Sequence, residues 1–387
     1  MSDTIRTEEV QSLLSEIIAI DSVNHNFREN RAGEADLCDW VESYLQNQRI
    51  AYQSQSVRNR QRNVVARVEG ADPSRVVCFE AHLDTTTARG MSVHPFGAEL
   101  ANGSVYGRGA CDCKSALAAM LVALKHLREA ATPPPRTVVV AATVDREVGM
   151  TGIQRLLTGF RPAAAVVGAP TNLGVARCCN GCVRWRFAVG ESPQSYVPNE
   201  RNAIRDAVRL ITALEARLAP AIASRPHPLL GEARLRPSRM RANGLEGFLP
   251  AHCAVEYECY CVPGFEASVI LDEINDVVST LVADEPSLKI AVEAPTLNDG
   301  PVELPESSAL VQAACSAGRA VLGAVDIVGY PDNGHANRFH AVGIPSIAFG
   351  PGHPSLARSA GERIPVAQLA PAAEVYLRIM RTALEMA

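Results

Sequence analysis

The sequence predicts an α/β fold in which helices flank a mostly parallel sheet, with a smaller α+β domain inserted into it. Near both ends of the chain, short apolar runs rich in β-branched residues lie between helical stretches. Strands of this kind are covered on both faces, as in parallel sheets between helices. The middle of the chain instead alternates apolar with polar residues, which predicts a sheet with one packed face.

Size, composition and charge narrow the class of protein. A chain of 387 residues is longer than one ordinary hydrophobic core and suits two domains. Its net charge of -5 gives no electrostatic reason to expect nucleic acid or an anionic membrane as a partner. The polar N-terminus resembles no signal peptide, and no apolar run approaches the length of a membrane span. The eleven cysteines are an odd number scattered through a large chain, which is typical of reduced thiols. We therefore expect a cytoplasmic protein.

The sheet domain is predicted to begin with two helices. Thr7 is expected to cap the first helix, whose apolar face is Val10, Leu13, Leu14, Ile17 and Ile18. The second helix is centred on Leu37, Val41, Tyr44 and Leu45. Buried strands follow at 75–79, 137–144, 163–168 and 346–349, with a helix at 115–127 between the first two.

The inserted domain is predicted from alternating strands and amphipathic helices. The alternating strands lie at 182–189 and 253–262, and a further strand is expected at 287–294. One helix carries Ile204, Val208, Ile211 and Leu218, and the other carries Ile270, Ile274, Val277, Val278 and Leu281. Cys253, Cys259 and Cys261 share one strand face and are interpreted as packing residues. The predicted boundaries are 1–181 and 295–387 for the sheet domain and 182–294 for the insertion.

Polar residues follow three of the predicted strands and turns, where ligands of α/β sheets gather. His82 and Asp84 end one strand, and an aspartate there can orient the imidazole of a metal-binding histidine. Asp112 lies in the glycine-rich turn GRGACDCK, and the next strand ends in TVDREVG, which holds Arg146 and Glu147. Each residue alone also fits a helix cap, a loop ion pair or a core histidine.

Together these motifs resemble the M20 family of metallopeptidases and deacylases, in particular its acetylornithine deacetylase and succinyl-diaminopimelate desuccinylase branch. The resemblance extends over nearly the whole chain and includes the segments HPFGAEL (94–100), VYGRGACDCKSALAAML (105–121), AATVDREVG (141–149), NAI (202–204), VPG (262–264) and GIPSIAFGPG (343–352), and Glu362. It implies a zinc-peptidase-like catalytic domain with two zinc ions. It also implies that the inserted domain serves as a lid and dimer interface.

The chain departs from the family pattern at the catalytic base and at the metal ligands. In the family, the segment that matches TVDREVG carries an aspartate, then the catalytic base, then a zinc ligand. The resemblance assigns these three positions to Asp145, Arg146 and Glu147. Arginine cannot accept a proton near neutral pH and cannot activate water. Two further ligand positions fall on Ala169 and Arg358. His82 and Asp112 would then hold the first zinc, and Asp112 and Glu147 the second.

The positions that face the substrate in the family also differ. The lid histidine maps to Gln194, a lid asparagine to Gly247, and the arginine that holds a substrate carboxylate to Tyr260. A family acid maps to His335. His335 and His353 are alternative proton carriers or metal ligands, although a loop histidine is more often neither. Cys111 and Cys113 flank Asp112, and we interpret them as packing residues.

These departures lead to an electrostatic hypothesis. Without metals, Asp84, Asp112 and Glu147 would repel one another, because two unit charges about 4 Å apart interact by about 4 kcal/mol at an effective dielectric near 20. Arg146 and Arg358 would supply the positive charge instead, in planar, multiply bonded pairs with the carboxylates. The alternative is that Arg146 turns outward to solvent and Arg358 lies on a loop. No cofactor is expected, and zinc at His82, Asp112 and Glu147 remains open.

Three functions fit this sequence. The first is a metal-independent enzyme that acts on a small amino-acid-like or peptide-like molecule by condensation, cyclisation or acyl transfer. Arg146 and Arg358 would polarise the substrate, while His82, oriented by Asp84, or His335 would move protons. Arg358, Gln194 and Tyr260 would contact the substrate. The second is an inactive binding or scaffold protein, and the third is a weakened single-metal N-acyl-amino-acid deacylase. The resemblance also implies a homodimer formed through the inserted domain.

Overall fold

The computed structural model describes residues 4–27, 33–191, 202–244, 249–265 and 267–382, which fall into two compact units. The larger unit is built from Met1–Arg177, Leu304–Tyr330 and Gly334–Ala387. The smaller unit is built from Cys178–Glu303 and Pro331–Asn333. It therefore extends beyond the expected insertion at 182–294.

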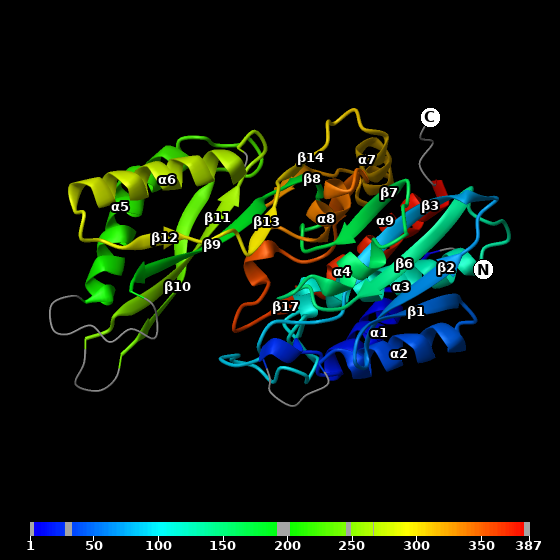
Figure 1. Cartoon of the computed structure of the whole chain (residues 1–387). Coiled ribbons are helices and arrows are strands. Elements are labelled where there is room, and N and C mark those ends of the chain that lie inside the picture. Colours follow the sequence, from blue (N-terminus) through cyan, green and yellow to red (C-terminus); the bar gives the residue numbers. More distant parts are fainter. Residues whose placement is uncertain (1–3, 28–32, 192–201, 245–248, 266, 383–387) are drawn as a thin grey trace. The chain divides into compact units, whose positions relative to one another are not determined.

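The larger unit contains a sheet whose central strands are parallel (Figure 1). Its strands are β1 (Ala51–Arg58), β2 (Gln61–Val68), β3 (Asp72–His82), β6 (Arg136–Thr143), β7 (Ala164–Gly168), β8 (Val175–Cys179), β14 (Val302–Glu303), β15 (Ile327–Tyr330) and β16 (Ser346–Phe349). The order is β1-β2-β6-β3-β7-β16-β8-β14, with β15 beside β8. β3 pairs in parallel with β6 and β7, and β16 pairs in parallel with β7. The predicted fold class and its four buried strands are confirmed.

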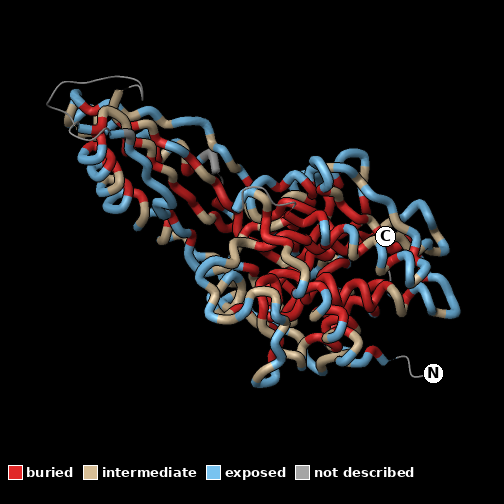
Figure 2. The backbone as a smooth tube through the Cα atoms, turned by 90° about the horizontal axis from the view of Figure 1, so that it is seen from below, coloured by how far each residue is buried: buried red, intermediate tan, exposed pale blue. Residues whose placement is uncertain are grey.

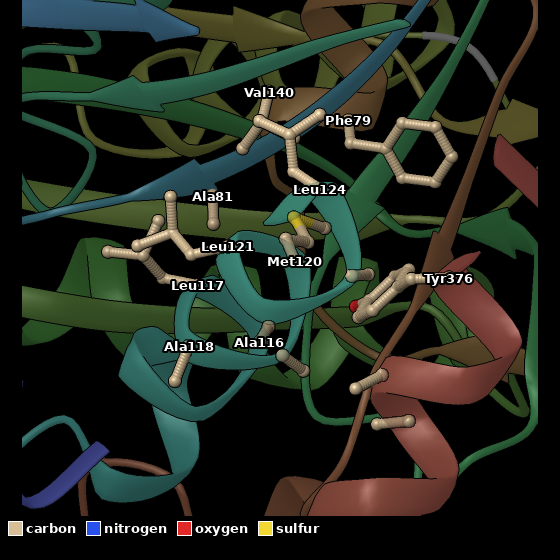
Figure 3. Close-up of a cluster of buried hydrophobic side chains, with 14 of the residues drawn as sticks. Phe79, Ala81, Ala116, Leu117, Ala118, Met120, Leu121, Leu124, Val140 and Tyr376 are labelled. Carbon is tan, nitrogen blue, oxygen red and sulfur yellow. The ribbon is translucent and has the colours of Figure 1, made fainter. Parts of the chain in front are cut away.

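Helices cover both faces of this sheet. They are α1 (Thr7–Ala19), α2 (Ala35–Asn47), α3 (Ser115–Arg128), α4 (Thr151–Leu156), α7 (Ala309–Leu322), α8 (His335–Ala341) and α9 (Leu369–Thr382). Helices α1, α3 and α9 pack together on one face, whereas α8 packs on β7 and β16 from the other. Figure 3 shows Phe79 and Ala81 of β3 in one hydrophobic cluster with α3 and with Tyr376 of α9.

The first helix shows what the apolar pattern predicts well and what it does not. Its five predicted apolar residues are all buried. The predicted cap is wrong, because Thr7 is already the first helical residue and Arg6 precedes it without a side-chain cap. Packing of the apolar face, rather than a capping hydrogen bond, therefore stabilises this helix.

The smaller unit is a five-stranded sheet covered by two helices. Its elements are β9 (Gly181–Gly190), α5 (Ala203–Ala223), β10 (Arg234–Asn243), β11 (His252–Cys261), α6 (Ala267–Asp284), β12 (Ile290–Val292) and β13 (Leu297–Asp299). The order is β10-β11-β9-β12, with β13 also on β9. Because β13 still pairs with β9, the smaller unit extends past the expected boundary at 294. Cys253, Cys259 and Cys261 are buried in its core, as the packing interpretation expects.

The buried face of α5 differs from the predicted one. Ile204 and Val208 are 37% and 50% exposed, while Ala207, Leu210 and Leu214 are buried. The buried stripe, which includes Leu218, is therefore rotated about the helix axis from the predicted stripe. Alanine, which helical periodicity weighs little, fills part of the contact with the sheet.

The remaining elements are short. A three-stranded sheet is formed by β4 (Glu99–Ala101), β5 (Ser104–Tyr106) and β17 (Arg363–Pro365), and the helical turns are η1 (His25–Phe27), η2 (Ala110–Lys114), η3 (Pro354–Leu356) and η4 (Val366–Gln368). Figure 2 shows buried residues (red) inside each unit. None of the described helices has the length and hydrophobicity that a membrane crossing requires.

Candidate functional site

His82 ends β3 inside the larger unit, where both of its ring nitrogens have partners. Nδ1 lies 2.8 Å from the backbone carbonyl oxygen of Asp84, and Nε2 lies 3.3 Å from Oδ1 of Asp112. The Asp84 carboxylate is farther from Nδ1, at 3.5 Å. The imidazole is therefore oriented mainly by the main chain, not by the Asp84 side chain as expected. Burial alone would lower the pKa of His82, but Cys113, Asp112 and Asp84 raise it well above its usual value.

The Asp84 carboxylate instead holds the turn that carries Arg146 and Glu147. Oδ1 accepts from the Arg146 backbone N–H (2.9 Å), and Oδ2 accepts from the Glu147 backbone N–H (2.8 Å) and from Nδ2 of Asn24 (2.8 Å). Burial opposes ionisation of Asp84, but its hydrogen bonds and the charge of His82 lower the pKa to about 2. Asp84 is thus a buried anion that fixes the backbone of the site.

Asp145 closes the same turn. Its φ of +63° lies in the left-handed region, and its carboxylate accepts from Asn24, from the Gly149 backbone and from Oγ1 of Thr151. A Cβ at Gly149 would lie 2.3 Å from Oδ2 of Asp145, so a larger residue there would displace a carboxylate that these hydrogen bonds hold. Asp145 therefore shapes the turn TVDREVG.

Asp112 lies in η2, and Glu362 holds this turn. Oε1 of Glu362 accepts from the backbone N–H groups of Cys111 (3.1 Å) and Asp112 (3.0 Å). Its Oε2 lies 2.7 Å from Nη1 of Arg108 in a buried ion pair. Glu362 matches the family pattern, but its sequence position alone assigns it no role. The structure shows that it positions Asp112.

Arg358 is a cation that lies near two of the site's carboxylates. Its Nη2 is 3.4 Å from Oδ2 of Asp112 and 3.3 Å from Oε1 of Glu147. The side chain is 34% exposed, whereas both carboxylates are buried. Burial would raise the pKa of Asp112, but Arg358 and His82 lower it well below its usual value. One nitrogen therefore lies near both acids, and the planar, multiply bonded pairs of the hypothesis stay a prediction.

Arg146 lies inside the same cluster. Its side chain is 9% exposed, and Nη1 is 3.9 Å from Oε1 of Glu147. This burial contradicts the alternative in which Arg146 points into solvent. Arg146 and Arg358 therefore both place positive charge beside Glu147, as the electrostatic hypothesis requires.

The residues present do not fit a two-metal centre. The position that the resemblance assigns to an acidic ligand is Ala169, which is buried and has no side-chain oxygen. The guanidinium of Arg358 lies between the two carboxylates that would share the second ion. A smaller set of donors is present, because His82, Asp112 and Cys113 offer ligand atoms within 4.8 Å of one another. Among the described residues Glu147 does not join that set, although the sequence analysis named it as the third ligand.

The two other candidate histidines have different environments. The ring of His335, at the start of α8, is 6.3 Å from the His82 ring between centroids and is buried. His353 is exposed, and its Nδ1 accepts from the backbone of Ser355 within its own turn. The structure therefore brings His335, but not the His353 side chain, to the carboxylate cluster.

The expected substrate contacts are not assembled in the described part of the larger unit. Gln194 and Gly247 lie outside the described residues. Tyr260 belongs to β11 of the smaller unit, where Arg236 lies over its ring at 4.9 Å and donates to its hydroxyl (3.1 Å). Their roles toward a substrate stay predictions.

Glu80 is a further site residue that no sequence motif indicates. It lies in β3 two residues before His82, and Oε1 is 2.8 Å from Nδ1 of His335. The available signal was a glutamate directly after the apolar run at 76–79, since a buried charge normally has a partner. The site thus combines fixed cations with an imidazole–carboxylate pair, and this combination suits binding an anionic group and moving a proton.

Comparisons with known proteins agree with this architecture. A putative succinyl-diaminopimelate desuccinylase from Mycobacterium tuberculosis is 28% identical over 90% of this chain and 93% of its own. An acetylornithine deacetylase from Myxococcus xanthus is 25% identical over 95% of both chains. The fold is similar to that of human carnosine dipeptidase 1, with a TM-score of 0.78, 16% identity and coverage of 98% of this chain and 97% of that one. Residues 78–382 match peptidase family M20/M25/M40, and the chain therefore belongs to that family.

Proposed function

We propose that this chain is an M20-family enzyme that works without the two metal ions and acts on a small amino-acid-like or peptide-like molecule. The observation that supports it is the bridge of Arg358 between Asp112 and Glu147. A guanidinium is permanently charged and supplies there the positive charge that carboxylates need. The partly exposed side chain of Arg358 also gives this charge access to a ligand.

The arginines suit a substrate that carries a carboxylate or a polarisable carbonyl. Arg146 and Arg358 would hold such a group as fixed positive charges, and preorganised charge of this kind stabilises a developing oxyanion. A proton carrier is also needed, and both nitrogens of His82 already have partners. His335 is therefore the better candidate for moving the proton. Condensation, cyclisation and acyl transfer all fit this arrangement.

A second candidate is a single-metal deacylase, in line with the names of the two relatives. The supporting observation is the group of ligand atoms from His82, Asp112 and Cys113. A histidine nitrogen, a carboxylate oxygen and a thiolate are all zinc ligands, and three protein ligands are typical of catalytic zinc sites. Metal bound there would polarise an amide carbonyl and lower the pKa of water.

Metal content and ligand turnover distinguish these functions. The full chain is purified with and without added Zn²⁺, its bound zinc is measured, and N-acetylornithine and N-succinyl-diaminopimelate are assayed for hydrolysis. We expect less than one zinc per ten chains and no hydrolysis of either probe. Stoichiometric zinc with deacylation would favour the second candidate. A small amino-acid-derived ligand that raises the melting temperature but is recovered unchanged would indicate a binding protein.

Restoring the family pattern is expected to restore metal binding. The triple variant Arg146→Glu, Ala169→Glu and Arg358→His removes two cations and adds three donor groups, so it should bind zinc with at least tenfold higher affinity than the natural chain. Isothermal titration with Zn²⁺ measures this. The control is Arg89→His, which adds a histidine at an exposed position. A folded triple variant that binds zinc no better than this control would show that the assigned positions do not form a metal centre.

A further inference from the structure

A buried imidazole–carboxylate pair joins the central sheet to α8. Oε1 of Glu80 lies 2.8 Å from Nδ1 of His335 and accepts from Oγ1 of Thr143 at 2.5 Å. Glu80 and His335 side chains are each 1% exposed. Because Phe79 and Ala81 face the core with α3 (Figure 3), the alternation of β3 turns Glu80 to the opposite face, where α8 packs.

Each member of the pair keeps one polar atom without a hydrogen-bond partner. Among the described residues, these atoms are Nε2 of His335 and Oε2 of Glu80. Buried polar groups normally have partners, so an unpaired imidazole nitrogen next to a candidate site suggests a partner that comes and goes. The residue before His335 lies near one of the cations, because a Cβ at Gly334 would lie 3.9 Å from Nη2 of Arg146.

We propose that Glu80 is a positioning residue that keeps the proton of His335 on Nδ1, so that Nε2 presents its lone pair to the ligand. This inference rests on the proposed function. In the step it supports, a ligand N–H or O–H bond breaks, its proton binds Nε2, and the electron pair stays on the ligand. The imidazolium is stabilised by the Glu80 carboxylate, and the proton later returns from Nε2 to the product.

Glu80 limits the choice of tautomer by hydrogen-bond geometry. The Thr143 hydroxyl donates its single hydrogen to Glu80, so the carboxylate accepts from both Thr143 and His335. The second nitrogen of a histidine carries the lone pair when the first donates to a carboxylate. Removing the carboxylate should free His335 to exchange between its two neutral tautomers.

The test is the tautomer of His335 in the full-length protein, measured by two-bond ¹H–¹⁵N correlation NMR with ¹⁵N-histidine labelling. The His335 resonances are assigned by their loss in His335→Asn. The natural chain is expected to show a protonated Nδ1 and an unprotonated Nε2. In Glu80→Ala the population protonated at Nε2 should increase at least fivefold. Thr143→Val keeps the carboxylate and should leave the tautomer unchanged.

Two results would overturn the inference. One is a natural chain in which Nε2 carries the proton, and this result needs no variant. The other is a folded Glu80→Ala protein whose tautomer ratio equals that of the natural chain. If Glu80→Ala does not fold, Glu80→Gln is measured in its place. His335 should then keep its Nδ1–H tautomer, because the amide oxygen of Gln can still accept a hydrogen bond from Nδ1. These readouts need no substrate, so failure of the proposed function leaves them interpretable.

Discussion

At the scale of single residues, the site is defined by how positive charge is distributed among its acids. Asp84 accepts hydrogen bonds from backbone N–H groups and Asn24 and lies beside His82. Asp112 and Glu147 instead share Arg358. The loss of this one arginine should therefore affect both carboxylates, while Asp84 keeps its partners.

Replacing Arg358 with alanine should destabilise the protein at neutral pH and make it responsive to divalent ions. The two carboxylates would lose a common cation, which costs about 1–2 kcal/mol after allowance for the partial exposure of Arg358. Zn²⁺ at 1 mM should then raise the melting temperature of this variant but not that of the natural chain. Differential scanning calorimetry measures both effects. Arg89→Ala is the control, and an equal response to zinc in both variants would contradict the prediction.

Glu34 makes stability depend on pH in the opposite direction from Asp84. It is buried, and its oxygens accept from the Asp145 backbone and from Gln61. Burial, followed by the charge of Asp84, raises the pKa of Glu34 from 4.5 to about 8. As the pH rises, Glu34 therefore loses its proton in the unfolded chain before it does so in the folded protein. The contribution of Glu34 to the free energy of unfolding falls as the pH rises from about 4.5 to about 8.

The variant Glu34→Gln is expected to remove that part of the pH dependence. Between pH 5 and 8 the free energy of unfolding of the natural chain should fall relative to that of the variant by a few kcal/mol, since one pKa unit corresponds to about 1.4 kcal/mol. Urea denaturation at several pH values measures the difference. Glu16→Gln, at an exposed position, serves as the control. Parallel pH profiles for the natural chain and Glu34→Gln would show that Glu34 ionises normally.

At the scale of elements, η2 depends on a residue from a distant part of the chain. Glu362, directly before β17, accepts from the backbone of η2 and pairs with Arg108. Truncating one partner of a buried ion pair leaves the other charge uncompensated. Glu362→Ala should therefore destabilise the protein by about 3–5 kcal/mol.

A solvent-exposed ion pair provides the matched control for this prediction. Nη1 of Arg209 lies 2.5 Å from Oε1 of Glu285, but the two side chains are 43% and 40% exposed. Glu285→Ala should therefore lower the free energy of unfolding by less than about 1 kcal/mol. Urea denaturation of both variants gives the comparison. Similar losses in the two would mean that Glu362 is compensated by solvent and does not hold η2.

The elements also show which parts of the fold a single sequence predicts. The parallel strands were predicted because all residues of β6 and β7 are buried and their apolar runs are unbroken. β1 was missed because its residues are polar and largely exposed. β10 was missed because its arginines and Pro237 obscure any apolar alternation. Strands that lie at a sheet edge leave little hydrophobic signal.

The site was predicted only as far as local motifs extend. His82, Asp112, Arg146 and Arg358 follow from the family pattern, and the structure brings them together. The pairing of Glu80 with His335 joins residues 255 positions apart, and no local pattern reports such a contact. The same limit applies to Glu362, whose partners precede it by about 250 positions.

At the scale of the whole molecule, the two units have separate hydrophobic cores. Leu121 belongs to the core of the larger unit and Leu214 to that of the smaller one, and each is 1% exposed. Domains with their own cores can open as separate cooperative units. The chain passes between the two units at only a few points, so a cavity in one core should leave the other intact.

Leu214→Ala and Leu121→Ala test this independence as a matched pair. Each should cost about 2–5 kcal/mol in its own unit, because each removes a buried leucine side chain. Hydrogen exchange followed by mass spectrometry should show faster exchange in β9 and β11 for Leu214→Ala, with β3 and β6 unchanged. Leu121→Ala should give the reverse pattern. If either variant accelerates exchange equally in all four strands, the two cores unfold as one cooperative block, and the stability of the candidate site depends on the inserted unit as well.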